Sequence, residues 1–136
     1  MVSKGKLVDG SPVLPVYLIC DTSLSMTYRV EKDKKRIDVL NEAITNLFVE
    51  ILNLNETTSR VEVCVISFND SPHLVLPLQA IDPEMRWEPL KPGGKTEVAK
   101  ALKFFDERLS IDEKNRAGLP SCRPVAFIIT DGEPTD

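Results

Sequence analysis

The sequence predicts an α/β fold, a three-layer sandwich in which helices cover both faces of a mostly parallel, doubly wound sheet with an antiparallel edge strand. Two features support this prediction. Nearly unbroken apolar runs, typical of strands buried on both faces, alternate with stretches whose apolar residues recur at helical spacing. Strands and helices that alternate in this way form layered α/β domains. The length of 136 residues suits one domain, which we expect to span 1–136 with a polar leader over 1–12.

The first half of the chain is predicted to form a strand, a helix and a pair of strands. Residues 13–20 are apolar and end at Asp21, which indicates a buried strand. The following helix is predicted from apolar residues on one stripe: Ile37, Leu40, Ile44, Leu47, Phe48, Ile51 and Leu54. Residues 61–68 form the second strand, and 73–78 form a shorter third one. Pro77 places that third strand at a sheet edge, because proline cannot donate a ladder hydrogen bond.

The second half is predicted to form a loop, a helix and a last strand. Residues 89–94 are expected to be a loop, and 110–123 a polar connection containing Gly118 and Pro120. Between them an amphipathic helix is marked by Val98, Ala101, Leu102, Phe105 and Leu109. Residues 124–130 form another apolar strand that ends at an aspartate. The basic run 32–36 is expected to be a solvated helix start or loop.

Composition excludes several classes of function. The net charge of −4 and the pI near 5.1 argue against a general nucleic-acid binder, which needs a basic surface. No apolar run approaches the roughly 20 residues of a membrane helix, so no membrane partner is expected. The three cysteines cannot all pair within one chain and show no C-x-x-C spacing. We therefore expect them to be reduced, which favours a cytoplasmic location.

Two buried strands that end in aspartate carry the functional signal. In an open α/β sheet, ligands bind beyond the carboxyl ends of the strands. Asp21 opens a segment with two serines, and a Gly-Gly-Lys loop delivers Thr96 just before a helix. Carboxylates and hydroxyls without histidine or cysteine suit Mg²⁺, with Mn²⁺ or Ca²⁺ as alternatives, rather than zinc or copper. The predicted metal ligands are Asp21, Ser23, Ser25, Thr96 and Asp131.

This arrangement resembles a known family. Asp21-x-Ser23-x-Ser25, then Thr96, then Asp131 is similar to the metal-ion-dependent adhesion site (MIDAS) of von Willebrand factor A-type (VWA) domains. Segments 16–26, 93–96 and 128–136 are most similar to stand-alone bacterial VWA proteins of the tellurite-resistance (TerY-like) type. The resemblance implies a sheet order of 3-2-1-4 in chain order. It also implies a non-enzymatic module in a bacterial stress-response assembly, whose bound ion is completed by an Asp or Glu carboxylate of a protein partner.

The chain departs from the family pattern at two points. The motif usually has glycine between its two serines, whereas this chain has Leu24, which could crowd the loop or cover part of the ion. The resemblance covers the family's first four strands, and family members continue beyond them. The sequence leaves open whether the chain is a fragment. If residues 124–130 form an edge strand, its unpaired backbone groups predict self-association along that edge.

Other roles for the same residues are weaker. Each aspartate, serine or threonine alone would suit a helix cap or a turn. A phosphotransferase of the haloacid-dehalogenase type, with Asp21 as nucleophile, is the main alternative function, but Ser23 stands where a general acid is needed. Gly94-Lys95-Thr96 ends like a phosphate-binding P-loop, yet Pro89 replaces the first glycine and no strand directly precedes the loop. The single histidine, His73, has no evident nucleophile partner.

Overall fold

A computed structural model describes residues 12–55, 60–85 and 87–130. The main elements in chain order are β1 (Leu14–Asp21), α1 (Arg36–Asn55), β4 (Val61–Phe68), β5 (Pro72–Ala80), α2 (Val98–Asn115) and β6 (Val125–Ile129). A 3-10 helix, η2 (Leu24–Thr27), and a small hairpin of β2 (Arg29–Glu31) and β3 (Lys34–Lys35) connect β1 to α1. The four long strands form one sheet in the order β5-β4-β1-β6.

The sheet is mostly parallel, as predicted. β1 pairs in parallel with both β4 and β6, and β5 pairs antiparallel with β4 at one edge. The predicted order 3-2-1-4 is therefore confirmed, and so is the edge position of the strand that contains Pro77. Within the described ranges β6 forms the opposite edge of the sheet.

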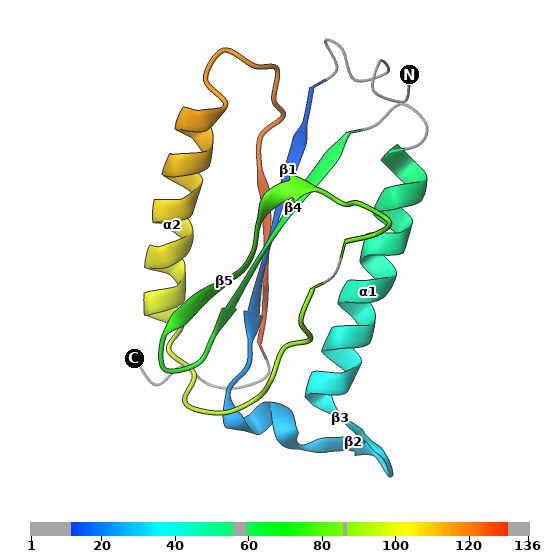
Figure 1. Ribbon diagram of the computed structural model, residues 1–136. Helices are drawn as coiled ribbons and strands as arrows, with labels where there is room; N and C mark the ends of the chain where they lie inside the picture. The colour runs from blue at the N-terminus through cyan, green and yellow to red at the C-terminus, as the bar shows by residue number, and fades with distance from the viewer. Residues whose placement is uncertain (1–11, 56–59, 86, 131–136) are drawn as a thin grey trace.

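Helices cover both faces of the sheet, which confirms the three-layer α/β architecture (Figure 1). Alternate residues of β1 point to opposite layers, as strand geometry requires. Val16, Leu18 and Cys20 pack into the core cluster that contains the buried stripe of α1. Tyr17 and Ile19 pack into the second cluster, beneath α2. Both faces of the central strand β1 are thus buried, and this packing positions the residues that follow the strand.

Two local predictions were wrong in part. The predicted connection 110–123 is helical at its start, because α2 continues to Asn115. The polar residues at 110–115 lie on the last turns of α2 and do not mark its end. The helix ends shortly before Gly118, which has a φ of +85°. The basic run 32–36 was expected to be a helix start or loop; residues 32–33 form a turn and Arg36 starts α1, as expected, but Lys34–Lys35 form β3. Asp38 accepts the backbone N–H of Lys35 at 2.9 Å and so fixes where α1 begins.

Candidate functional site

The carboxylate of Asp21 forms hydrogen bonds at the ends of two strands. Asp21 is the last residue of β1 and has no exposed surface. Its Oδ1 atom accepts the backbone N–H of Ser23 at 2.7 Å, and its Oδ2 atom accepts the hydroxyl of Thr130 at 2.6 Å. Thr130 directly follows β6, so this hydrogen bond joins the ends of β1 and β6. A buried carboxylate with hydrogen bonds to both oxygens is held in one orientation.

The two predicted serine ligands lie side by side. The Oγ atoms of Ser23 and Ser25 are 3.1 Å apart, with Ser23 buried and Ser25 half-buried. The tight 3-10 turn of η2 creates this approach, since the backbone N–H of Met26 donates to the Ser23 carbonyl at 3.0 Å. Leu24, between the serines, has 61% of its surface exposed and therefore points into solvent. The expected crowding of the loop by Leu24 is not seen.

The glycine-rich loop runs beside the serine segment. The backbone N–H of Leu24 donates to the Gly94 carbonyl at 2.9 Å, and that of Gly93 donates to the Thr22 carbonyl at 2.7 Å. Thr96, two residues further on, is buried. The N-cap of α2 is Glu97, so Thr96 does not cap that helix. The loop therefore carries the Thr96 hydroxyl to the same end of the sheet as the two serines.

A second attachment holds the loop from the β4 side. The backbone N–H of Lys95 donates to Asp70 Oδ1 at 2.8 Å, and that of Glu97 donates to the Asn69 carbonyl at 3.1 Å. Gly94 has a φ of +84°, and a Cβ atom there would lie 3.2 Å from Asp70 Oδ1. Only glycine fits this conformation without strain. Hydrogen bonds thus hold the loop between the segments that follow β1 and β4.

The structure places four of the five predicted ligands at one end of the sheet. Asp21, Ser23 and Ser25 are linked by hydrogen bonds, and Thr96 is on the adjoining loop. Asp131 lies outside the described residues, although Thr130 next to it contacts Asp21. Within residues 12–55, 60–85 and 87–130, no group of three or more His, Cys, Asp or Glu side chains could hold a metal ion. The role of Asp21, Ser23, Ser25 and Thr96 as metal ligands stays a prediction.

The donor set fits a hard divalent cation. Two oxygens that share an octahedral shell at the Mg²⁺ distance lie about 3 Å apart, and the two serine hydroxyls already have this separation. Sequence reasoning missed Thr130 and Asp70 as supports of the site. Thr130 could have been identified from the sequence, because its hydroxyl directly precedes Asp131 at the end of an apolar run. No local signal marked Asp70, because its partner Lys95 is 25 residues away.

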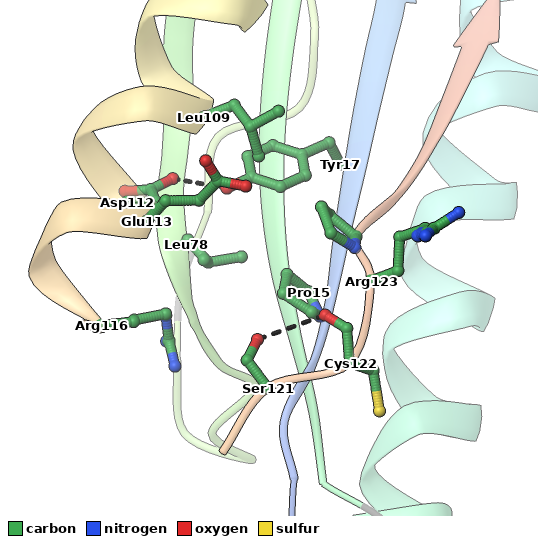
Figure 2. Close-up of a pocket in the computed structure, with 11 residues that line it drawn as sticks. Pro15, Tyr17, Leu78, Leu109, Asp112, Glu113, Arg116, Ser121, Cys122 and Arg123 are labelled. Atoms are coloured by element: carbon green, nitrogen blue, oxygen red, sulfur yellow. Dashed lines mark hydrogen bonds between the residues drawn. The ribbon is translucent and has the colours of Figure 1, made fainter. Parts of the chain in front are cut away.

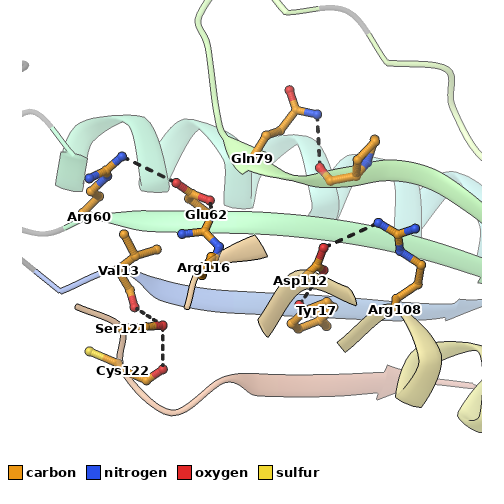
Figure 3. A network of polar contacts seen from close by, with 11 residues as sticks. Val13, Tyr17, Arg60, Glu62, Gln79, Arg108, Asp112, Arg116, Ser121 and Cys122 are labelled. Carbon is orange, nitrogen blue, oxygen red and sulfur yellow. Dashed lines mark hydrogen bonds and ion pairs between the residues drawn. The ribbon is translucent and has the colours of Figure 1, made fainter. Parts of the chain in front are cut away.

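A cavity of about 270 Å³ lies at the other end of the sheet, beneath the last turns of α2 (Figure 2). On its wall the buried hydroxyl of Tyr17 donates to Asp112 Oδ2 at 2.7 Å, and Arg108 approaches Asp112 Oδ1 at 3.5 Å. Burial, and then the hydrogen bond to Asp112, raise the pKa of Tyr17. Nearby, Glu62 pairs with Arg116 and Arg60 (Figure 3). These contacts join α2 to β1 and β4, and they suit a structural role.

Comparison with known proteins decides the family. The family model of the von Willebrand factor type A domain matches residues 16–133. The chain belongs to this family. No curated protein matches the chain. This VWA domain thus has the family's sequence pattern as well as its topology.

Solved structures support the same fold at low identity. The PilB minor pilin of Streptococcus sanguinis is 18% identical, with a TM-score of 0.68 over 89% of this chain and 30% of the pilin. The vWF domain of the pilus tip protein Mfa5 of Porphyromonas gingivalis is 17% identical, with a TM-score of 0.57 over 90% of this chain and 38% of that one. An uncharacterised membrane-spanning protein of Vibrio fischeri is 14% identical, with a TM-score of 0.55 over 74% of this chain and 51% of that one. This chain therefore spans about half or less of each of these proteins.

VWA domains are often protein-interaction modules. The helices in the described part of the chain are not long and apolar enough to cross a membrane.

Proposed function

We propose that this VWA domain is a metal-ion-dependent protein-binding module with a MIDAS-type site. The observation that carries the proposal is the pair of serine hydroxyls 3.1 Å apart, beside a buried aspartate whose carboxylate is fixed by two hydrogen bonds. These groups lie at the carboxyl end of the sheet, where α/β folds bind ligands. Mg²⁺ is the proposed ion, with Mn²⁺ and Ca²⁺ as alternatives.

Each residue has a distinct proposed role. Ser23 and Ser25 supply adjacent hydroxyl oxygens, and Thr96 supplies a third from the clamped loop. Asp21 orients Ser23 through its backbone N–H and provides negative charge, and Asp131 provides the second charge. Five groups with only two formal charges leave a divalent ion electrophilic when it is bound. An Asp or Glu carboxylate of a partner protein would then complete the site.

We infer binding and not catalysis at this site. A phosphotransferase would need Asp21 to attack a phosphoryl group, but this side chain has no exposed surface and both its oxygens accept hydrogen bonds. A general acid is also needed, and the neighbouring positions offer hydroxyls. His73 lies 3.5 Å from the hydroxyl of Ser71, a neighbour that the sequence did not predict, but both side chains are exposed and this distance is at the limit of a hydrogen bond. The arrangement supports a rigid binding site better than a nucleophile.

Titration with Mg²⁺ tests the proposal directly. The wild type should bind Mg²⁺ in calorimetry, and at a concentration 100 times the Kd its unfolding free energy should rise by about 2.7 kcal/mol. Asp21→Asn keeps the shape and one acceptor oxygen, and Asp131→Asn does the same at the second charge. Both variants should lose most of the Mg²⁺ response, whereas the exposed control Asp106→Asn should keep it. Equal Mg²⁺ binding by all four proteins, or none by the wild type, would refute the metal site.

The cellular role is a separate proposal. The likeness of segments 16–26, 93–96 and 128–136 to TerY-like proteins supports a bacterial stress-response assembly of the tellurite-resistance type. Three free thiols, two of them buried, support a cytoplasmic location. Deletion of the gene should increase sensitivity to tellurite, and cell fractionation should place the protein in the cytoplasm. Normal growth on tellurite, or recovery from the cell surface, would contradict the respective part.

A further inference from the structure

Three exposed apolar residues lie on the segment that includes and follows the second proposed serine ligand. Leu24, Tyr28 and Val30 have 61%, 58% and 51% of their surface exposed. All three lie within seven residues, on the η2 and β2 segment that also carries the second serine. Isolated exposed apolar residues are ordinary, but a group beside a binding site indicates a contact surface. We call residues 24–36 the site hairpin.

The site hairpin is also basic, in a chain that is acidic. Its positive side chains are Arg29, Lys32, Lys34, Lys35 and Arg36, and its negative ones are Glu31 and Asp33. Five positive and two negative side chains leave a net charge of +3, against −4 for the whole chain. Positive charge is therefore concentrated on this segment, although that of Lys34 is paired with Glu42 of α1 at 3.0 Å. Such asymmetry favours partners of negative charge and steers them to this end of the molecule.

Backbone contacts hold the hairpin in place relative to the serines. The N–H of Tyr28 donates to the Ser25 carbonyl at 3.1 Å, and the N–H of Arg36 donates to the Tyr28 carbonyl at 2.9 Å. The Arg36 guanidinium lies over the Tyr28 ring, 5.2 Å from its centre. Arg29 donates to the Lys32 carbonyl at 2.7 Å. Figure 1 shows the hairpin at the same end of the molecule as the carboxyl end of β1. The surface is thus ordered before any partner binds, which lowers the cost of binding.

We propose that the site hairpin binds the same protein partner as the metal site, and that this partner presents an acidic segment with an aliphatic or aromatic residue beside its metal-binding carboxylate. This inference rests on the proposed function and adds the chemistry of the partner to it. The apolar residue would pack on Leu24 and Val30, and the additional carboxylates would face the lysines. Nucleic acid fits less well, because the net charge of the whole chain is −4 and the exposed apolar side chains of the hairpin would find no matching group on a phosphate backbone.

Capped fluorescent peptides test the proposal by polarisation in Mg²⁺. The first peptide has one aspartate flanked by leucine and two glutamates; the second replaces the glutamates by lysines, and the third replaces the leucine by glycine. The first should bind at least ~10-fold more tightly than the second at low salt, and the gap should narrow at high salt. The first should also bind more tightly than the third. Equal affinities, no measurable binding of the first, or equally tight binding of a single-stranded DNA oligonucleotide would overturn the proposal.

Matched variants locate the effect on the hairpin. Val30→Ser and the double variant Lys32→Glu with Lys35→Glu should each weaken binding of the first peptide several-fold. Val49→Ser on α1, where the side chain is 50% exposed, and Lys103→Glu on α2 should not weaken it. Calorimetry separates this inference from the proposed function: hairpin variants should bind free Mg²⁺ like the wild type, while Asp21→Asn should not. Hairpin variants that bind the peptide normally would refute the hairpin contact even if Mg²⁺ binding is confirmed.

Discussion

Replacing Tyr17 with phenylalanine should lower the free energy of unfolding without disturbing the proposed metal site. Tyr17 lies on β1 with no exposed surface, and its hydroxyl donates to Asp112 Oδ2 at 2.7 Å, across 95 residues of sequence. This bond ties the last turns of α2 to the central strand. At its other end α2 follows the loop of Thr96, so the bond helps to seat the helix as a whole.

The expected loss is about 1.5–3 kcal/mol, because a hydrogen bond to a charged acceptor is removed and Asp112 stays buried. Arg108 offsets little of this, since its nitrogen is 3.5 Å from the other carboxylate oxygen. Packing should change little, because phenylalanine keeps the edge contact with the Phe105 ring, whose centre is 5.1 Å away. The loss therefore measures the hydroxyl and not a cavity.

Urea denaturation of Tyr17→Phe, Asp112→Asn and the double variant measures the effect and its coupling. The two single losses should not add, because both remove the same bond. Mg²⁺ affinity should stay within about twofold of the wild type, since the loop at the site has its own backbone hydrogen bonds. A loss below about 0.5 kcal/mol for Tyr17→Phe, the usual size for a neutral surface change, would refute the reasoning.

Three further predictions concern pH, the glycine loop and the β6 edge. Burial raises the pKa of the Cys20 and Cys64 thiols from 9.0 to about 12. The stability that these thiols contribute is therefore complete below pH 9 and is lost as pH rises toward 12. Circular dichroism should show the melting temperature falling over this range, and falling less in Cys64→Ala. Gly94→Ala and Gly118→Ala should each lower the free energy of unfolding, measured by urea denaturation, by about 1–2 kcal/mol, because both glycines have positive φ. Calorimetry should show weaker Mg²⁺ binding only for Gly94→Ala. Light scattering of the 136-residue chain should show self-association along β6, which is an edge strand within the described ranges and where Phe127 is 52% exposed. Phe127→Lys should abolish this self-association, and a strict monomer at high concentration would refute the prediction.

Periodicity and strand ends predicted most of the fold and part of the site. The run before Asp21 is apolar at every position because both faces of β1 are covered, and this signal is visible in sequence. The convergence of Asp21 with the end of β6 follows from parallel strands that end at one edge. The order of the strands, in contrast, required the family resemblance, since periodicity does not say which strand is central.

The features that were missed depend on contacts between distant residues. Asp112 looks like a surface residue in sequence, yet its burial depends on Tyr17 and Arg108, and only the packed helix brings these side chains together. The hairpin of β2 and β3 has too few residues for a strand pattern, and its charges favoured a solvated loop. The exposed apolar group beside the site could not be recognised because exposure is a property of the fold.

The hydrogen bonds of Asp21 also explain how a site built mainly of hydroxyls can be ready for an ion. Each carboxylate oxygen has two acceptor positions, and Ser23 and Thr130 occupy one on each oxygen. These two contacts fix the direction in which the carboxylate faces. The loop of Thr96 is held independently by Thr22, Leu24 and the turn after β4. Since these contacts do not use the ion, its binding requires little ordering of the chain, and weak ligands can suffice.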